Sequence, residues 1–166
     1  MSWLARKRLG LSGPQYGPEL VVNTEFATNT TGYVVTNATW TRVDSSSDPG
    51  VGSGGLDVYC GKVAVWSASG RGRYVVTLEV GKTYKVTCRA YAVDGGKAGI
   101  SFSAGNGYDS SMASHVTGSS VWETLELTAV ATTTTTYIIL IPRSAAVNSA
   151  SGDIAYFDAL SIREVL

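Results

Sequence analysis

Carboxylate side chains are the first candidates for chemistry, because glycoside hydrolysis needs two of them on either side of one bond. The candidates are Glu79, Glu123, Glu126 and Asp158. Glu123 and Glu126 lie in one expected strand at an odd separation, so their side chains should point to opposite faces. No other spacing pairs two carboxylates, and we therefore expect no hydrolytic site.

Nucleophilic and metal chemistry have equally little support. A catalytic triad needs a histidine, and His115 is the only one. It lies in a Gly/Ser-rich segment near Asp109, where an exposed loop histidine is the favoured interpretation over a catalytic base. One histidine and two distant cysteines, Cys60 and Cys88, are too few for a zinc cluster. The cysteines could bridge only from neighbouring strands, and two buried free thiols are favoured. The chain is not expected to be an enzyme.

Aromatic side chains with amide and carboxylate neighbours suit another task, which is stacking on sugar rings and bonding their hydroxyls. Tyr91 should face away from the core, because it shares its strand face with Lys85, Thr87 and Arg89. Packing within the fold is the favoured role for Trp40, Trp66 and Trp122 taken singly, and Tyr33 is a further aromatic candidate. The predicted glycan contacts are Tyr91, Tyr108, Asn106, Asp109 and Trp40.

The elements that would position these residues are strands. Charged residues make up 16% of the 166 residues, below the roughly 25% usual for soluble proteins, and Gly, Ser and Thr take their place. Thr83–Val93 alternates with Tyr84, Val86, Cys88 and Ala90 on one face, and Tyr137–Ile141 is a continuous apolar run typical of a central strand. Eight to ten strands are expected, with long loops at Ser45–Gly55 and Gly105–Ser120. The zero net charge argues against nucleic acid or an anionic membrane as partner.

Residues 1–18 differ from the rest of the chain. They combine cations with large apolar side chains and end in two Gly/Pro steps. One interpretation is a disordered terminus, and the other is an extended arm that docks on a partner. The residues expected to anchor that arm are Trp3, Leu4, Arg6, Lys7, Arg8, Leu9 and Leu11. No apolar run follows the basic cluster, so a secretory signal is not expected, and no apolar segment is long enough to span a membrane.

Four segments, in order, resemble the jelly-roll carbohydrate-binding modules found beside bacterial glycosidases. They are Glu19–Phe26 as the opening strand, Leu78–Thr87 as the central hairpin, Trp122–Ala129 and the closing Ala155–Ile162. The resemblance covers residues 19–163 and implies a single jelly-roll β-sandwich over 19–166 after the 1–18 arm. It also implies that the sandwich binds glycans without catalysing a reaction.

The same module is also found in virion proteins of tailed bacteriophages, after a short segment like Tyr16–Asn23. The resemblance therefore favours a non-enzymatic capsid decoration, head fibre or tail fibre protein, made in the host cytoplasm and displayed on the virion surface. Its partners would be other virion proteins through the arm, cell-surface glycans and further copies of itself, by analogy as a trimer. The alternatives are a free or enzyme-associated lectin-like module and, last, a small hydrolase.

A structural calcium ion is the one cofactor that the resemblance raises. The family places an acid after the opening phenylalanine, where this chain has Ala27, and Glu25 precedes the phenylalanine instead. Asp158 matches the family's closing acid. Because calcium takes six to eight oxygen ligands, Asp158 and Glu25 give weak support, and the favoured expectation is no cofactor.

Overall fold

The computed structural model describes residues 13–22, 26, 30–44, 59–93, 96–105, 107, 109, 113–117, 120–143 and 149–166. Within these ranges the chain forms ten strands and no helix. The all-β class predicted from the sequence is confirmed. The described residues include no helix long and apolar enough to cross a membrane.

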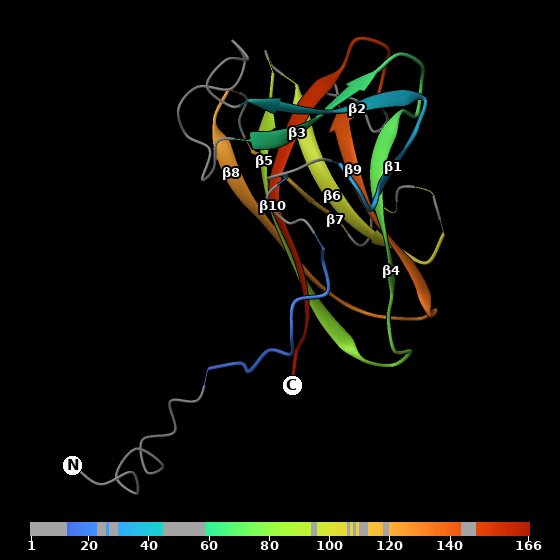
Figure 1. Cartoon of the computed structure of the whole chain (residues 1–166), viewed down its shortest axis with the longest axis vertical. Helices are drawn as coiled ribbons and strands as arrows, with labels where there is room; N and C mark the ends of the chain where they lie inside the picture. The colour runs from blue at the N-terminus through green and yellow to red at the C-terminus, as the bar shows by residue number, and fades with distance from the viewer. Residues whose placement is uncertain are drawn as a thin grey trace, which may run out of the picture.

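The strands form two antiparallel five-stranded sheets that pack face to face (Figure 1). The first, called the β4–β9 sheet here, has the order β1 (Tyr33–Thr36), β4 (Arg71–Thr77), β9 (Thr135–Arg143), β6 (Lys97–Ser103) and β7 (Ala113–His115). The second, the β5–β10 sheet, has the order β2 (Ala38–Asp44), β3 (Tyr59–Val65), β10 (Ile154–Glu164), β5 (Thr83–Ala92) and β8 (Trp122–Val130). The predicted β-sandwich is confirmed.

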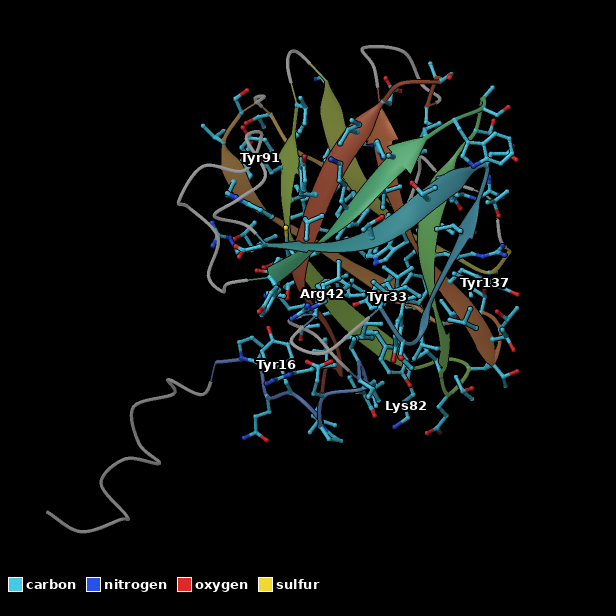
Figure 2. All side chains as sticks on the ribbon, turned by 45° about the horizontal axis from the view of Figure 1, so that its top comes forward. Tyr16, Tyr33, Arg42, Lys82, Tyr91 and Tyr137 are labelled. Atoms are coloured by element: carbon cyan, nitrogen blue, oxygen red, sulfur yellow. The ribbon has the colours of Figure 1, made fainter. Side chains whose placement is uncertain are left out.

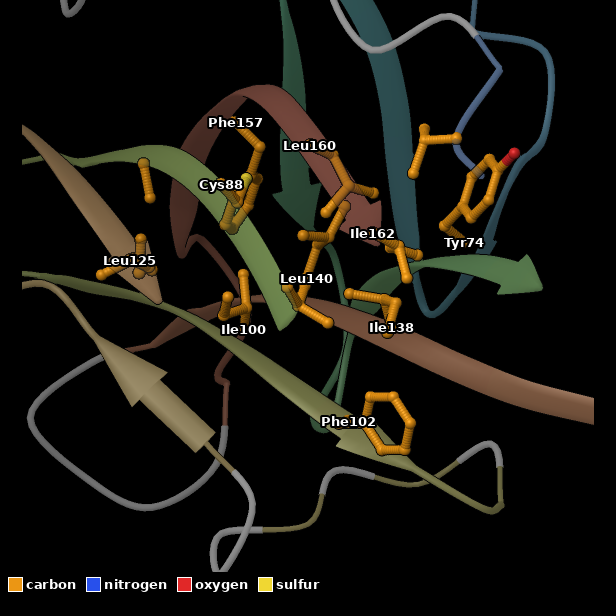
Figure 3. Close-up of a cluster of buried hydrophobic side chains, with 14 of the residues drawn as sticks. Tyr74, Cys88, Ile100, Phe102, Leu125, Ile138, Leu140, Phe157, Leu160 and Ile162 are labelled. Atoms are coloured by element: carbon orange, nitrogen blue, oxygen red, sulfur yellow. The ribbon is translucent and has the colours of Figure 1, made fainter. Parts of the chain in front are cut away.

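The core lies between the sheets and follows the period-two alternation of each strand. Tyr84, Val86, Cys88 and Ala90 of β5 point into it, as the sequence predicts. Residues from both sheets meet there, including Ile100, Leu140, Phe157 and Ile162 (Figure 3). The two sheets thus bury one continuous apolar layer, which is the dominant source of stability for such a fold.

Strand β9 is central in its sheet and is buried on both faces. Ile138 and Leu140 belong to the core between the sheets, whereas Ile139 and Ile141 alternate with them and are 0% and 2% exposed on the outer side. The threonine run before it bends at residues 132–134 and enters the strand at Thr135. The segment Gly105–Ser120, predicted to be a loop, contains the short strand β7.

Strand β10 contains an irregularity that keeps its apolar residues directed inward. The register against β5 shifts between Asp158 and Ser161, and Ala159 has a φ of 49°. Phe157, Leu160 and Ile162 all lie in the core, although Phe157 and Leu160 are three residues apart. One extra residue restores the inward face, as a β-bulge does.

Trp40 of β2 lies between the sheets. Its ring stacks on Tyr33 with centroids 4.8 Å apart and is nearly parallel to that of Phe157 at 6.3 Å. Gly61 of β3 and Gly72 of β4 approach it so closely that an added Cβ would come within 2.4 Å and 2.3 Å of the indole. The two glycines make room for this ring, so Trp40 packs within the sandwich.

Residues 13–22 run antiparallel to the end of β10. Tyr16 bridges Val165, and the Gly17 and Leu20 amides donate to the carbonyls of Glu164 and Ile162. Glu19 fastens this segment, because its carboxylate accepts hydrogen bonds from the amides of Val21 and Ile162 and from the side chains of Ser161 and Arg163. The segment up to residue 18, predicted as an arm, therefore contacts the sandwich from Gln15 onward.

The two cysteines are free and buried. Cys88 lies in the core between the sheets, whereas Cys60 belongs to a small cluster with Tyr91 and Tyr156. Their strands, β3 and β5, are separated by β10. The favoured interpretation of two buried thiols is confirmed, and burial raises the pKa of the Cys88 thiol above its ordinary value.

Candidate functional site

The outer face of the β4–β9 sheet presents an arginine next to a tyrosine. Arg73 of β4 alternates with the core residues Tyr74 and Val76, so its side chain points outward. Tyr137 points the same way from β9, and the Arg73 guanidinium lies 5.9 Å from its ring centroid. This distance is typical of a cation–π pair. The pair offers a flat ring and planar donors on one open sheet surface.

Arg73 retains unused hydrogen-bonding capacity. Its Nε atom is buried, and among the described residues it has no hydrogen-bond partner. No described carboxylate forms a salt bridge with Arg73 either. Because a buried donor without an acceptor is unfavourable, the guanidinium of Arg73 is the candidate group for contact with a ligand oxygen.

A second arginine, Arg71, lies two residues away on the same face of β4. It donates from Nη1 to the carbonyl of Ser69 at 2.8 Å. Burial and the positive charge of Arg73 both lower the pKa of Arg71, as expected when like charges are held together. The face is therefore rich in donors and positively charged at its β4 side.

Two further residues lie outside the core of this sheet. Trp66 lies in the connection that leads into β4 and is 62% exposed, so its ring is open to solvent and does not pack in the core. Ser101 of β6 lies on the outer face, alternating with the core residues Ile100 and Phe102, and accepts a hydrogen bond from the Asp109 amide at 3.3 Å. Asp109, a predicted glycan contact, is thus placed beside this sheet.

The structure separates the predicted glycan contacts. Tyr91 faces away from the main core, as expected, but on the outer side of the other sheet, and it is 8% exposed. Figure 2 shows Tyr91 and Tyr137 on opposite sides of the sandwich. Trp40 is partly buried against the core, where its ring stacks on Tyr33 and lies nearly parallel to Phe157. Asn106 and Tyr108 lie outside the described residues.

Tyr91 is packed within a cluster on that opposite face. Its ring lies 5.7 Å from that of Trp122 and 5.9 Å from that of Tyr156. Arg89 lies 5.5 Å from the centre of the Trp122 ring. Sequence alternation correctly predicts that Tyr91 points outward, but it carries no information about the neighbours from β8 and β10 that cover the ring.

Other predicted residues fall into two groups. The arm residues Trp3, Leu4, Arg6, Lys7, Arg8, Leu9 and Leu11, together with Glu25, lie outside the described part of the chain. Asp158 is 1% exposed at the β10 bulge, where its Oδ1 accepts from the Ala159 amide at 2.8 Å. The described residues include no group of three or more metal-binding side chains.

The two carboxylates of β8 do not form a pair. Glu123 accepts from the amide and hydroxyl of Thr117, whereas Glu126 forms a salt bridge with Lys85 of β5 at 2.8 Å. Their different partners agree with the opposite faces that the sequence predicts. This geometry does not hold two carboxylates on either side of one bond, as glycoside hydrolysis requires.

No family model matches the sequence, and no curated protein matches it. Solved structures do share the fold. TmCBM61, solved in complex with beta-1,4-galactotriose, is 17% identical with a TM-score of 0.61, and the match covers 88% of this chain and 98% of that one. The xylan-binding domain CBM22-1 of Paenibacillus barcinonensis Xyn10C is 12% identical with a TM-score of 0.62, covering 94% and 98%.

A bacteriophage protein also matches. The enzymatically active domain of tailspike protein 4 of bacteriophage CBA120 is 14% identical with a TM-score of 0.59, and the match covers 89% of this chain but 21% of that one. At such identities the likeness concerns the fold alone. The jelly-roll fold of carbohydrate-binding modules, implied by the sequence resemblance, is thereby established.

Proposed function

We propose that this chain is a non-catalytic carbohydrate-binding module that binds glycans on the outer face of its β4–β9 sheet. The Arg73–Tyr137 pair is the observation that carries the proposal. A sugar ring can stack on Tyr137, while the guanidinium of Arg73, whose Nε lacks a partner among the described residues, donates to a hydroxyl. The fold shared with TmCBM61 and CBM22-1 supports the same role.

The test is affinity electrophoresis against soluble polysaccharides, including β-1,4-galactan and xylan. Tyr137→Ala and Arg73→Gln should each weaken retardation by roughly tenfold or more, the effect of losing about 1.4 kcal/mol of binding free energy. Arg89→Gln is the matched control, because Arg89 also faces an aromatic ring but on the opposite sheet. Equal retardation of all three variants and the wild type would disprove this site.

Catalysis is not part of the proposal. The carboxylates Glu123 and Glu126 have separate partners, which supports binding without turnover. Aryl glycosides and the bound polysaccharide should remain intact on long incubation. Turnover that a Glu123→Gln or Glu126→Gln variant abolished would contradict a purely binding role.

A second candidate is a structural protein of a bacteriophage virion surface, such as a capsid decoration, head fibre or tail fibre. The fold likeness to the CBA120 tailspike domain favours it, as does the basic and apolar composition of residues 1–12. In this role the N-terminal arm would attach the module to other virion proteins, and the sandwich would display the glycan-binding face. Deleting residues 2–12 should abolish co-sedimentation with particles, and undiminished incorporation would argue for a free module.

A further inference from the structure

A pocket lies on the outer face of the β5–β10 sheet, opposite the proposed glycan face. It has a volume of about 180 Å³ and is lined by Tyr16, Lys85, Thr87, Ser161 and Arg163. Four of these residues form two directly opposed pairs across β5 and β10, Thr87 with Ser161 and Lys85 with Arg163. Tyr16 comes from the N-terminal segment and closes one side, with the Lys85 Nζ 5.5 Å from its ring centre.

The pocket brings two positive charges together. Directly opposed like charges on neighbouring strands are unfavourable unless they are neutralised. Here each cation has one carboxylate partner: Glu126 lies 2.8 Å from the Lys85 Nζ, and Glu19 lies 3.2 Å from the Arg163 Nε. Glu19 also accepts hydrogen bonds from backbone amides and the Ser161 hydroxyl, so it is not bound by Arg163 alone.

Hydrogen-bond donors outnumber hydrogen-bond acceptors among the side chains around the pocket. A lysine has three donors and an arginine has five. The hydrogen bonds described for Arg163 use its Nε, and the Nη groups have no acceptor among the described residues. Thr87 adds a hydroxyl. A ligand that fits must therefore supply acceptor oxygens, and a carboxylate supplies them with the complementary charge.

The remaining wall is apolar. The Tyr16 side chain leaves a flat ring available, and Tyr16 is 37% exposed. Such a ring can stack on the C–H face of a sugar. The volume is below the roughly 300–1,000 Å³ of pockets for drug-sized ligands, which limits the occupant to a single small ring.

We propose that this pocket is a second binding site that accepts one carboxylated sugar residue, a uronic acid. Lys85 and Arg163 bind the carboxylate, Tyr16 stacks on the ring, and Thr87 and Ser161 contact ring hydroxyls. The choice of a sugar rests on the proposed carbohydrate-binding function, whereas the preference for an acid rests on the pocket alone. Binding also holds the N-terminal segment (residues 13–22) against β10, because Tyr16 belongs to that segment and also lines the pocket.

The test is an NMR titration of the full chain with D-glucuronate, with D-glucose as the neutral ring and acetate as an anion without a ring. Glucuronate should shift the amides of Thr87 and Ser161 and bind at least about tenfold more tightly than either control, as expected for one additional charge-assisted hydrogen bond or ring contact. Equal binding of glucose would overturn the preference for an acid. Equal binding of acetate would overturn the assignment of a sugar.

Variants separate this site from the proposed glycan face. Lys85→Met should abolish the glucuronate shifts, and Tyr16→Ala should weaken them at least about tenfold by loss of the ring contact. Glu126→Gln should tighten binding severalfold, because it removes the carboxylate that competes for Lys85. Weaker binding by Glu126→Gln would contradict an anionic ligand.

The final experiment uses the double variant Arg73→Gln with Tyr137→Ala. This double variant should lose polysaccharide binding while keeping the glucuronate shifts, whereas Lys85→Met should do the reverse. If the double variant loses both, one surface binds both ligands and the second site is disproved. If the wild-type chain binds no polysaccharide but still shows the glucuronate shifts, the proposed function is disproved. The pocket then remains an acid-binding site.

Discussion

Glu19 is a single residue on which the docking of the N-terminal segment depends. Burial alone would raise the pKa of its carboxyl group. The hydrogen bonds from the Ile162 amide, the Ser161 hydroxyl, the Val21 amide and Arg163 outweigh that effect, and the pKa is lowered from its ordinary value of 4.5. The carboxylate form is thus bound more tightly in the folded chain than in the unfolded one.

A pH dependence of stability follows from this lowered pKa. The stabilisation is complete above pH 4.5 and is lost as the pH falls through the lower folded-state pKa. Glu19→Gln should reduce the free energy of unfolding by about 1–3 kcal/mol at pH 7, and the difference from wild type should shrink in acid. Urea melts across this pH range provide the measurement, with the exposed Glu79→Gln as control. A constant difference at all pH values would contradict this role.

The two thiols should be chemically silent in the native protein. Cys60 and Cys88 are each 1% exposed, and burial holds the pKa of Cys88 high, so little reactive thiolate forms. We expect no reaction with a thiol reagent at pH 8 until denaturant is added, when both groups react. Equal melting temperatures with and without reductant would complete the check. Rapid modification of the folded chain would show that one thiol is accessible.

Tyr91 and Tyr137 show which properties of a single side chain can be predicted from the sequence. Alternation along Thr83–Val93 correctly places Tyr91 outward, because it depends only on the strand period. Whether that ring is open or covered depends on Trp122 and Tyr156, which are distant in sequence. Tyr137 begins an apolar run that indicates a buried strand, so its outward ring next to Arg73 was not predicted.

At the scale of elements, the Trp40 ring packs closely against Gly61 of β3 and Gly72 of β4. Gly61→Ala should lower the free energy of unfolding by about 1–3 kcal/mol, the usual cost of overpacking, because the new methyl would lie 2.4 Å from the indole. Gly105→Ala is a suitable control, since nothing lies within 4 Å of its added Cβ. Thermal melts would measure both. An unchanged Gly61→Ala variant would show that the indole shifts without cost.

The strands differ in how well the sequence predicts them. The strand β5 has unbroken alternation, so its inward set is predicted correctly. The β10 bulge changes the inward set after Phe157, and no local signal marks it, because Ala159 is not a residue that favours a positive φ. The short β7 pairs with Gly99–Ser101 of β6, and this pairing is invisible in a Gly/Ser-rich segment.

At the scale of the whole molecule, the N-terminal segment closes one end of the sandwich. Deleting residues 2–22 should destabilise the fold by at least about 2 kcal/mol, from lost burial of Val21, lost packing of the partly buried Leu20 and the lost Glu19 contacts. Deleting residues 2–12 should leave the melting temperature unchanged, since the described contacts begin at Gln15. Calorimetry on both truncations would decide. A large loss on removing 2–12 would show that those residues also stabilise the fold.

The sandwich itself was predictable because strand period, turn residues and the four ordered motifs all agree on one architecture. The candidate site was not, because a β-sandwich has two outer faces and the sequence does not say which strands share one. Tyr91 and Asp109 are predicted as one group of contacts, yet Tyr91 lies on the β5–β10 sheet and Asp109 lies beside the β4–β9 sheet. Arg73 and Tyr137 become neighbours only through the pairing of β4 with β9.

The antiparallel pairing of Tyr16 with Val165 also determines how the protein resists mechanical force. Gln15 bonds Leu166 and Gly17 bonds Glu164, so tension between residue 13 and residue 166 loads these hydrogen bonds one after another. The segment would unzip instead of shearing, and β10 would then peel from β3 and β5, to which it is also antiparallel. A pulling experiment through these two points should give a low first rupture force, whereas anchors that shear β10 along its length should give a higher one.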